Sequence, residues 1–173
     1  MPALDLVDPE RYVREVVEAR GNLFSFSLDS DRWRTYRKRV RLRWRSVRFT
    51  RGNRGLVPEA RGVYTFIVHA SHDCLPPHGY PVYVGITGDG RSKETLTTRY
   101  AGYLREQKER DRYHIFFMLN KWKNNIFFCY ATVRDKRYSL GKLETALNDA
   151  LLPPFSRKDF SAEVRELIRA FPR

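Results

Sequence analysis

The sequence predicts an α+β fold, in which a small three-stranded sheet of mixed or antiparallel strands is flanked by helices and preceded by a basic extension. Two runs rich in β-branched and aromatic residues, 63–68 and 81–86, are separated by a polar loop with two prolines, as in a β-hairpin with a long connection. A similar run at residues 126–133 predicts a third strand. Between and after these runs, apolar residues recur at helical spacing, so helices are expected to cover the sheet.

The length and charge of the chain predict one domain with a basic appendage. The chain has 173 residues, and its 33 Lys and Arg against 20 Asp and Glu give a formal net charge of +13. Such a surplus predicts attraction to a polyanion, most often nucleic acid. We expect residues 1–58 to form a basic N-terminal extension that contacts nucleic acid, and residues 59–173 to form the main domain.

Cysteine usage and hydropathy predict where the protein resides. Two cysteines, Cys74 and Cys129, make no disulfide framework in a chain of this length, which is typical of a reducing compartment. Nothing resembles a secretory signal, and no apolar run approaches the ~20 residues of a membrane helix. We therefore expect a soluble cytoplasmic protein without a membrane partner, either a monomer or a homodimer.

The N-terminal third predicts one helix and one strongly basic segment. Residues 8–20 form an amphipathic pattern behind an Asp-Pro start, which predicts a helix. Residues 32–54 contain eleven Arg or Lys and no acid. Asp31 is a suitable N-cap and favours a helix there, while the alternation of Val40, Leu42 and Trp44 with arginines leaves a strand over residues 40–49 as the alternative. In either conformation one face is arginine, which should contribute affinity for phosphates rather than sequence choice. The alternative is an arginine-rich face that merely pairs with local acids, but the segment contains none.

The loop inside the hairpin contains four side chains that can bind zinc, namely His69, His72, Cys74 and His78. Structural zinc sites usually take ligand pairs from two separated segments, whereas these four are close neighbours. A plain polar loop is therefore the favoured interpretation.

Four helices are expected after the hairpin, at residues 95–110, 113–123, 139–152 and 161–171. Asn124 and Asn125 supply the turn before the third strand. The residues expected to face the core are Leu96, Tyr100, Tyr103 and Leu104 on the first of these helices, Leu140, Leu143, Leu147 and Leu151 on the third, and Val164, Leu167, Ile168 and Phe171 on the last.

Two charged residues lie at the edges of these apolar stripes. Arg99 stands four residues before Tyr103, so the two share one edge of their helix. Glu144 stands between Leu140 and Leu147 on its own helix. Removing an unpaired carboxylate from water costs several kcal/mol, so a cation must lie opposite Glu144. Arg99 and a bound metal ion are the two candidates.

The order of these features resembles that of the GIY-YIG nucleases. Gly62-Val63-Tyr64 opens the hairpin and Tyr83-Val84-Gly85 closes it. Arg99 with an aromatic residue four positions later follows, and then Glu144 on a helix before a Pro-Pro turn. Each motif is short, but their order over residues 62–156 is much more specific than any one of them.

The resemblance implies a metal-dependent DNA endonuclease that hydrolyses phosphodiester bonds, with restriction or phage defence as a possible role. It implies that Glu144 binds Mg²⁺ or Mn²⁺ and that Arg99 holds the scissile phosphate. Tyr64 would position or deprotonate the attacking water, and Tyr83 and Tyr103 would orient the water and phosphate. A free phenol has a pKa near ~10, so a nearby cation must lower the pKa of Tyr64 before it can act as a base. Duplex DNA is the expected partner, with branched or single-stranded DNA as alternatives.

One position departs from the family pattern. After the Pro-Pro turn the family usually has asparagine, whereas this chain has Ser156, which is shorter and lacks the amide donor. Ser156 is still expected to be the catalytic-site residue at this position. Two other functions therefore stay open: a non-catalytic nucleic-acid-binding module of the same fold, and a basic structural or ribosome-associated protein whose aromatic residues all belong to the core.

Overall fold

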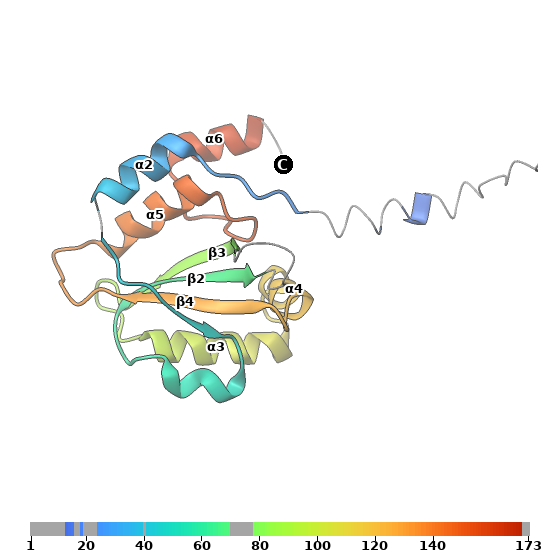
Figure 1. Cartoon of the computed structure of the whole chain (residues 1–173), viewed down its shortest axis with the longest axis horizontal. Coiled ribbons are helices and arrows are strands. Elements are labelled where there is room, and N and C mark those ends of the chain that lie inside the picture. Colours follow the sequence, from blue (N-terminus) through green and yellow to red (C-terminus); the bar gives the residue numbers. More distant parts are fainter. Residues whose placement is uncertain (1–12, 16–17, 19–23, 40, 70–77, 171–173) are drawn as a thin grey trace, which may run out of the picture.

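The structure, a computed structural model, describes residues 13–15, 18, 24–39, 41–69 and 78–170. These residues form an antiparallel sheet with the strand order β1-β4-β2-β3, flanked by helices (Figure 1). The strands are β1 (Arg45–Arg48), β2 (Gly62–His69), β3 (Gly79–Thr87) and β4 (Ile126–Thr132). The helices are α2 (Ser30–Arg39), the 3-10 helix η1 (Arg51–Leu56), α3 (Leu96–Glu109), α4 (Tyr113–Lys121), α5 (Leu140–Leu151) and α6 (Ala162–Ala170).

Helices cover both faces of the sheet. Tyr64 and Phe66 of β2 pack with α3 and α4, whereas Val63 packs with α2 and α5. In Figure 1, α3 lies below the sheet and α2, α5 and α6 lie above it. Burial on both faces explains why β2 is mostly apolar, without an alternation of polar and apolar residues. Strand β3 lies at one edge of the sheet, so side chains from the two helical layers can approach each other beyond it.

The α+β class and the predicted hairpin are confirmed, but the sheet has four strands rather than three. The additional strand, β1, comes from the basic segment and pairs with β4, with Val47 opposite Phe128. Phe49 follows β1 directly and is buried in the core beside Phe66. The two interpretations of this segment both occur, since α2 occupies its first part and β1 a later part. The boundary predicted after residue 58 stays a prediction, although β1 lies before it and belongs to the same sheet.

Capping residues fix the ends of the two helices that approach β3. The Thr95 hydroxyl accepts a hydrogen bond from the Thr98 N–H, and the Thr98 hydroxyl accepts one from the Thr95 N–H, which starts α3 with a reciprocal cap. The Ser139 hydroxyl accepts a hydrogen bond from the Lys142 N–H and starts α5. Helix α5 stops at Leu152, which has a left-handed φ of 45°, directly before the two prolines.

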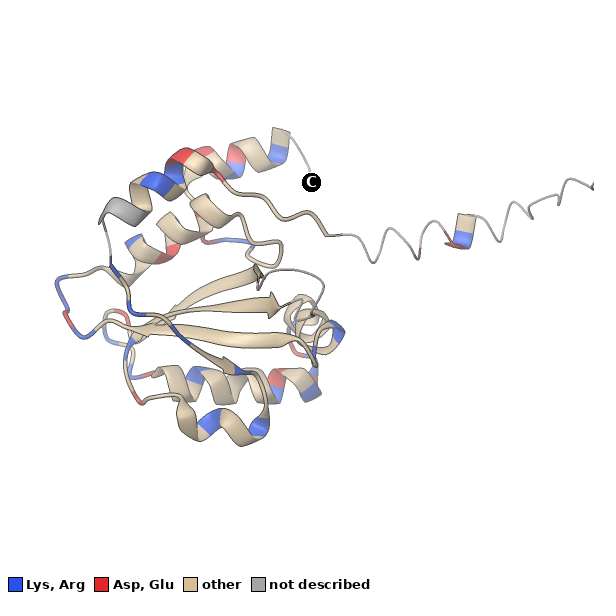
Figure 2. Ribbon diagram, in the orientation of Figure 1, with Lys and Arg blue, Asp and Glu red and all other residues tan. Residues whose placement is uncertain are grey.

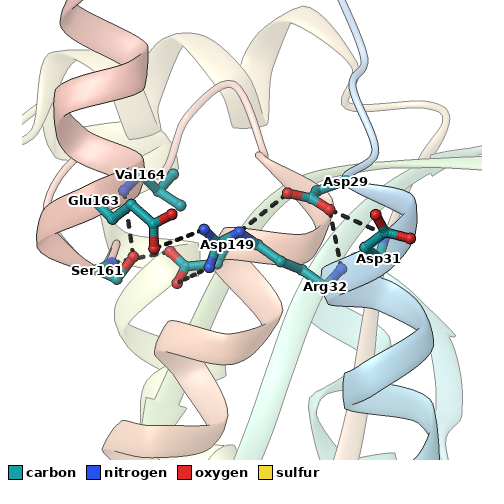
Figure 3. Close-up of polar contacts among 7 residues, drawn as sticks. All are labelled: Asp29, Asp31, Arg32, Asp149, Ser161, Glu163 and Val164. Atoms are coloured by element: carbon teal, nitrogen blue, oxygen red, sulfur yellow. Dashed lines mark hydrogen bonds and ion pairs between the residues drawn. The ribbon is translucent and has the colours of Figure 1, made fainter.

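Arg32 shows that part of the basic segment serves the fold. Its guanidinium lies 3.0 Å from a carboxylate oxygen of Asp29 and 2.9 Å from one of Glu163, and 4.0 Å from one of Asp149 (Figure 3). Asp149 also accepts a hydrogen bond from the Ser161 N–H. Arg32 thereby joins α2 to α5 and to the start of α6. The sequence favoured phosphate binding by this arginine face because the segment itself contains no acid. For Arg32 the alternative, an arginine paired with acids, holds instead, because its acidic partners come from outside the segment.

Several other predictions can be placed on the structure. Helix α6 buries Val164, but Leu167 is exposed, so its predicted inward orientation is wrong. His69 packs on Phe127 and His78 on Tyr80. His72 and Cys74 lie outside the described residues, as do Phe171 and most of the helix predicted at residues 8–20. Within the described parts of the chain, no helix is long and apolar enough to cross a membrane.

Candidate active site

Five side chains singled out from the sequence gather at the β3 edge of the sheet. Tyr64 and Tyr83 come from the hairpin, and Arg99 and Tyr103 come from α3 on one face. Glu144 comes from α5 on the other face. The charges of Arg99 and Glu144 both act on the pKa of Tyr64, and Arg99 also acts on that of Glu144. Residues from two strands and two helices therefore share one electrostatic environment.

The three phenols form a cluster of their own. The hydroxyl oxygens of Tyr64 and Tyr103 are 3.0 Å apart and share a hydrogen bond. The ring of Tyr83 lies 6.4 Å from that of Tyr64 and 6.1 Å from that of Tyr103. Tyr83 is opposite Phe66 in the β2–β3 ladder, so its side chain lies on the same face of the sheet as that of Phe66, toward α3. A β-bulge follows this pair: the next residue of β2 is opposite Pro81, so β3 has one extra residue there.

Gly85 provides the space in which Tyr64 lies. The two residues are opposite each other in the β2–β3 ladder. A Cβ atom on Gly85 would lie 2.5 Å from the Tyr64 hydroxyl oxygen and 2.6 Å from its Cζ. The final glycine of the Tyr-x-Gly motif is therefore required sterically, because the Tyr64 ring crosses directly over its Cα.

Burial keeps all three phenols protonated at neutral pH. It is the largest cause that raises the pKa of Tyr64, of Tyr83 and of Tyr103 above the usual range for tyrosine. The positive charge of Arg99 lowers the pKa of Tyr64 but does not offset the burial. In the free protein these hydroxyls are neutral donors and acceptors, suited to orienting a ligand oxygen or a water molecule.

Arg99 has a carboxylate partner, but that partner is not Glu144. Its Nη2 lies 2.7 Å from a carboxylate oxygen of Glu94, just before α3. Its Nε is buried, and no hydrogen-bond partner for it occurs among the described residues. The structural pair between Arg99 and Glu144 that the sequence left open is not formed. Arg99 thus presents one buried donor that is free to bind an additional acceptor in the site.

Glu144 is a carboxylate in a poorly solvated place. Burial, followed by the negative charge of Asp159, raises its pKa to about 7, while Arg99 acts in the opposite direction. None of the ion pairs within the described residues includes Glu144. A cation placed beside this side chain would favour its charged form and relieve the desolvation cost.

The donor set at this place fits Mg²⁺ better than zinc. No group of three or more His, Cys, Asp or Glu side chains that could hold a metal occurs in the described ranges, so Glu144 would bind a metal with at most one further such side chain. Zinc requires three or four such ligands, whereas Mg²⁺ keeps several waters and often uses one or two carboxylates with substrate phosphate. The residues present therefore fit a magnesium ion shared with a phosphate ligand.

Ser156 and Asn148 lie beside the site from two directions. The Ser156 hydroxyl oxygen accepts a hydrogen bond of 3.3 Å from the Val84 N–H, next to Gly85. Asn148 stands one turn after Glu144 on α5 and is fully buried. Neither its amide nitrogen nor its amide oxygen has a hydrogen-bond partner within the described chain. A buried amide without partners costs free energy, because folding removes the hydrogen bonds that both of its polar atoms make to water.

We expect Asn148→Leu to raise the free energy of unfolding by about 1–3 kcal/mol, because leucine has a similar shape and removes two unpaired buried polar atoms. Urea unfolding at neutral pH measures this change. Ser156→Ala is the opposite case, since it leaves the Val84 N–H without its acceptor and should lower stability by a similar amount. A loss of stability in Asn148→Leu would mean that the amide has partners that stabilise the fold.

No protein-family model, curated protein or solved structure matches this chain. The family resemblance therefore stays a prediction that rests on the residues themselves. Sequence reasoning missed Glu94, Asp159 and Arg112 as neighbours of the site. Arg112 lies 5.3 Å from the Tyr103 ring and pairs with Glu106. All three missed residues lie outside the apolar stripes, and no short-range pattern connects them to the motifs.

Proposed function

We propose that the protein is a metal-dependent DNA endonuclease that hydrolyses phosphodiester bonds at the β3 edge of its sheet. The observation that supports this most is that Arg99 and Glu144 come from opposite helical layers and that the charges of both act on Tyr64 in the phenol cluster. Hydrolysis of a phosphodiester needs a cation on the non-bridging oxygens, an oriented water and stabilisation of the leaving oxygen. The residues at this edge offer each of these functions.

Each side chain has a distinct role in this proposal. The buried Nε of Arg99 donates to a non-bridging phosphate oxygen, where a charge-assisted hydrogen bond is strong. Tyr64 orients the attacking water rather than deprotonating it, because burial keeps its pKa high. Tyr103 holds Tyr64 through their shared hydrogen bond. Glu144 would bind Mg²⁺ or Mn²⁺. When bound, the ion would act as a Lewis acid on the phosphate oxygens and lower the pKa of the attacking water, whose proton would pass to solvent.

Glu94 is a competitor for the phosphate in this proposal. Its carboxylate already lies against Arg99, so phosphate must displace it or share the guanidinium. Both side chains are partly exposed, and such an ion pair contributes at most about 1 kcal/mol. We expect Glu94→Gln to tighten DNA binding about two- to fivefold in the presence of a chelator, measured by fluorescence anisotropy at low salt. Weaker binding by this variant would show that Glu94 positions Arg99 for phosphate instead of competing for it.

A non-catalytic nucleic-acid-binding module is the second candidate. Two observations favour it: Ser156 stands where the resembling family has asparagine, and the neutral Tyr64 phenol is a poor base. Such a module would keep the arginines on the surface and lose turnover. Figure 2 shows basic residues along α2, the β1 segment and η1, a distribution that serves either candidate.

Incubation of supercoiled plasmid with the purified protein separates the two candidates. We expect nicked or linear DNA with Mg²⁺ or Mn²⁺, and intact plasmid when a chelator is added. Glu144→Gln protein from the same preparation controls for a contaminating nuclease. Binding of the plasmid without any cleavage, in both metals and over a range of pH, would favour the module.

A further inference from the structure

A hollow of about 720 Å³ lies between the Pro153-Pro154 turn, α6 and residues 24–25. Three exposed arginines line it: Arg157 follows the turn, and Arg165 and Arg169 come from α6. The two on α6 are four residues apart, so they lie on one face of the helix, about 6 Å apart along its axis. The hollow therefore has a row of guanidinium groups along one side.

The positive charge of this hollow is not compensated. None of its lining residues is acidic, and none of the ion pairs within the described residues includes the three arginines. The carboxylates of α6 do not line it, and Glu163 is paired with Arg32 (Figure 3). The hollow between α2 and α5 differs, because Asp31 and Asp149 lie beside its cations. The charge of the α6 hollow is thus available for a polyanion.

Aromatic side chains line the same hollow. Phe24, Phe155 and Phe160 contribute to it. Phe155 and Phe160 are buried, whereas Phe24 is partly exposed and its ring stacks on that of Phe155 with the centroids 5.7 Å apart, so Phe24 is the ring that a ligand can reach. A cationic groove with aromatic side chains is the arrangement with which proteins bind single-stranded nucleic acid, since unstacked bases pack on rings while phosphates meet arginines. The bases of a duplex are already stacked on one another and cannot use such rings.

The hollow is joined to the candidate active site through Ser156. This residue lines the hollow, and its hydroxyl also accepts the hydrogen bond from Val84 of β3. A line of cations follows the same path. Burial is the largest cause that lowers the pKa of His114, and the positive charges of Arg157 and Arg112 lower it further. Arg112 faces the Tyr103 ring and pairs with Glu106, so these two arginines lie between Tyr103 and the hollow.

We propose that this hollow binds a single strand of nucleic acid that leaves the site beside Ser156, with phosphates on Arg157, Arg165 and Arg169 and a base near Phe24. This proposal rests on the proposed function, because the strand in the hollow is taken to be the same strand whose phosphate lies at Arg99. It assigns the hollow to the unpaired nucleotides next to the cleaved bond, which the candidate active site does not contact. A branched or partly single-stranded DNA is the substrate class that follows.

Binding without turnover tests the hollow directly. Fluorescence anisotropy with a labelled single-stranded oligonucleotide, in a chelator, compares the full-length protein with Arg165→Gln/Arg169→Gln over a series of salt concentrations. The loss of two phosphate contacts should reduce the slope of log affinity against log salt concentration by about 1.4. It should also weaken binding at least about fivefold at low salt. The matched control is Lys136→Gln/Arg137→Gln, in the β4–α5 loop at the opposite end of the sheet (Figure 1), which should leave the slope unchanged.

The possible results separate the hollow from the proposed function. An unchanged slope in the α6 variant, with normal circular dichroism, would overturn the assignment. Equal displacement of the oligonucleotide by poly-glutamate of the same length would also overturn it, in favour of an acidic protein partner. If the wild type never nicks plasmid but the α6 variant loses strand binding, the hollow stands and the nuclease proposal fails. If the wild type nicks plasmid and the α6 variant binds the oligonucleotide normally, the nuclease proposal stands and the assignment of the hollow fails.

Discussion

Glu144→Gln should reduce plasmid cleavage by about 10³-fold or more while leaving DNA affinity, measured in a chelator, within twofold of the wild type. The substitution keeps the size of the side chain but removes the only protein ligand proposed for the metal. Lewis-acid stabilisation of a phosphoryl oxygen is worth several kcal/mol, and each 1.4 kcal/mol corresponds to about tenfold in rate. Binding should persist because the phosphate contacts of the arginines remain.

The same variant should be more stable than the wild type, in a pH-dependent way. The pKa of Glu144 is raised to about 7 in the folded protein, from its ordinary value of 4.5. The folded state therefore holds its proton in a range where the unfolded chain has lost it. The carboxyl costs no stability below about pH 4.5, and stability falls as the pH rises toward 7, by at most about 3 kcal/mol. Glutamine cannot ionise, so Glu144→Gln should show its gain at pH 8 and lose it at pH 4.

Thermal unfolding with and without Mg²⁺ supplies a test that needs no cleavage. A metal that binds only the folded protein raises its melting temperature, so Mg²⁺ should stabilise the wild type and have no effect on Glu144→Gln. Glu166→Gln, an exposed change on α6, is the control of equal charge. Wild-type turnover by Glu144→Gln, or an equal Mg²⁺ effect on both proteins, would remove Glu144 from the site.

The hairpin and the helices could be predicted because their apolar residues follow local patterns that differ between strands and helices. Strand β2 is a short run bounded by turn residues, and α3 and α5 each place apolar residues on one stripe. Strand β1 could not be predicted with the same certainty. It has only four residues, two of them arginine, and what holds it is its pairing with β4, about eighty residues later. Pairing of this kind depends on tertiary structure, which a local pattern does not contain.

The site shows the same division between local and distant effects. The motif residues could be found because their order in the chain is specific, and the structure brings Tyr64, Tyr103 and Arg99 together. The pairing of Arg99 with Glu94 could not be predicted, because Glu94 lies in a turn outside any apolar stripe. The same is true of the effect of Asp159 on Glu144. Charges that reach a site from loops alter its pKa values without any sequence periodicity.

Gly85→Ala should destabilise the protein by about 1–3 kcal/mol and slow plasmid cleavage by about 10²-fold. The added Cβ would lie 2.5 Å from the Tyr64 hydroxyl oxygen, so the ring must move. It has little room, because it is 2 % exposed and stacks on Phe128 with the ring centroids 5.1 Å apart. Moving it also breaks the hydrogen bond to Tyr103, and a displacement of about 1 Å at a reacting centre can cost 10²-fold in rate.

Two further variants show whether the clash with Tyr64 is the cause. Gly102→Ala adds the same methyl group within α3, where a Cβ would meet no heavy atom within 4 Å. It should stabilise the protein by about 0.5–1 kcal/mol, since alanine favours a helix interior. Tyr64→Leu shortens the side chain above Gly85, so in the double variant the added methyl group should cost at least about 0.5 kcal/mol less than in the wild type. Urea unfolding of the four proteins in this cycle measures the coupling. If the changes in unfolding free energy of the two single variants simply add in the double variant, the clash with Tyr64 is not the reason why Gly85 is needed. The steric explanation for the glycine at this position would then be wrong.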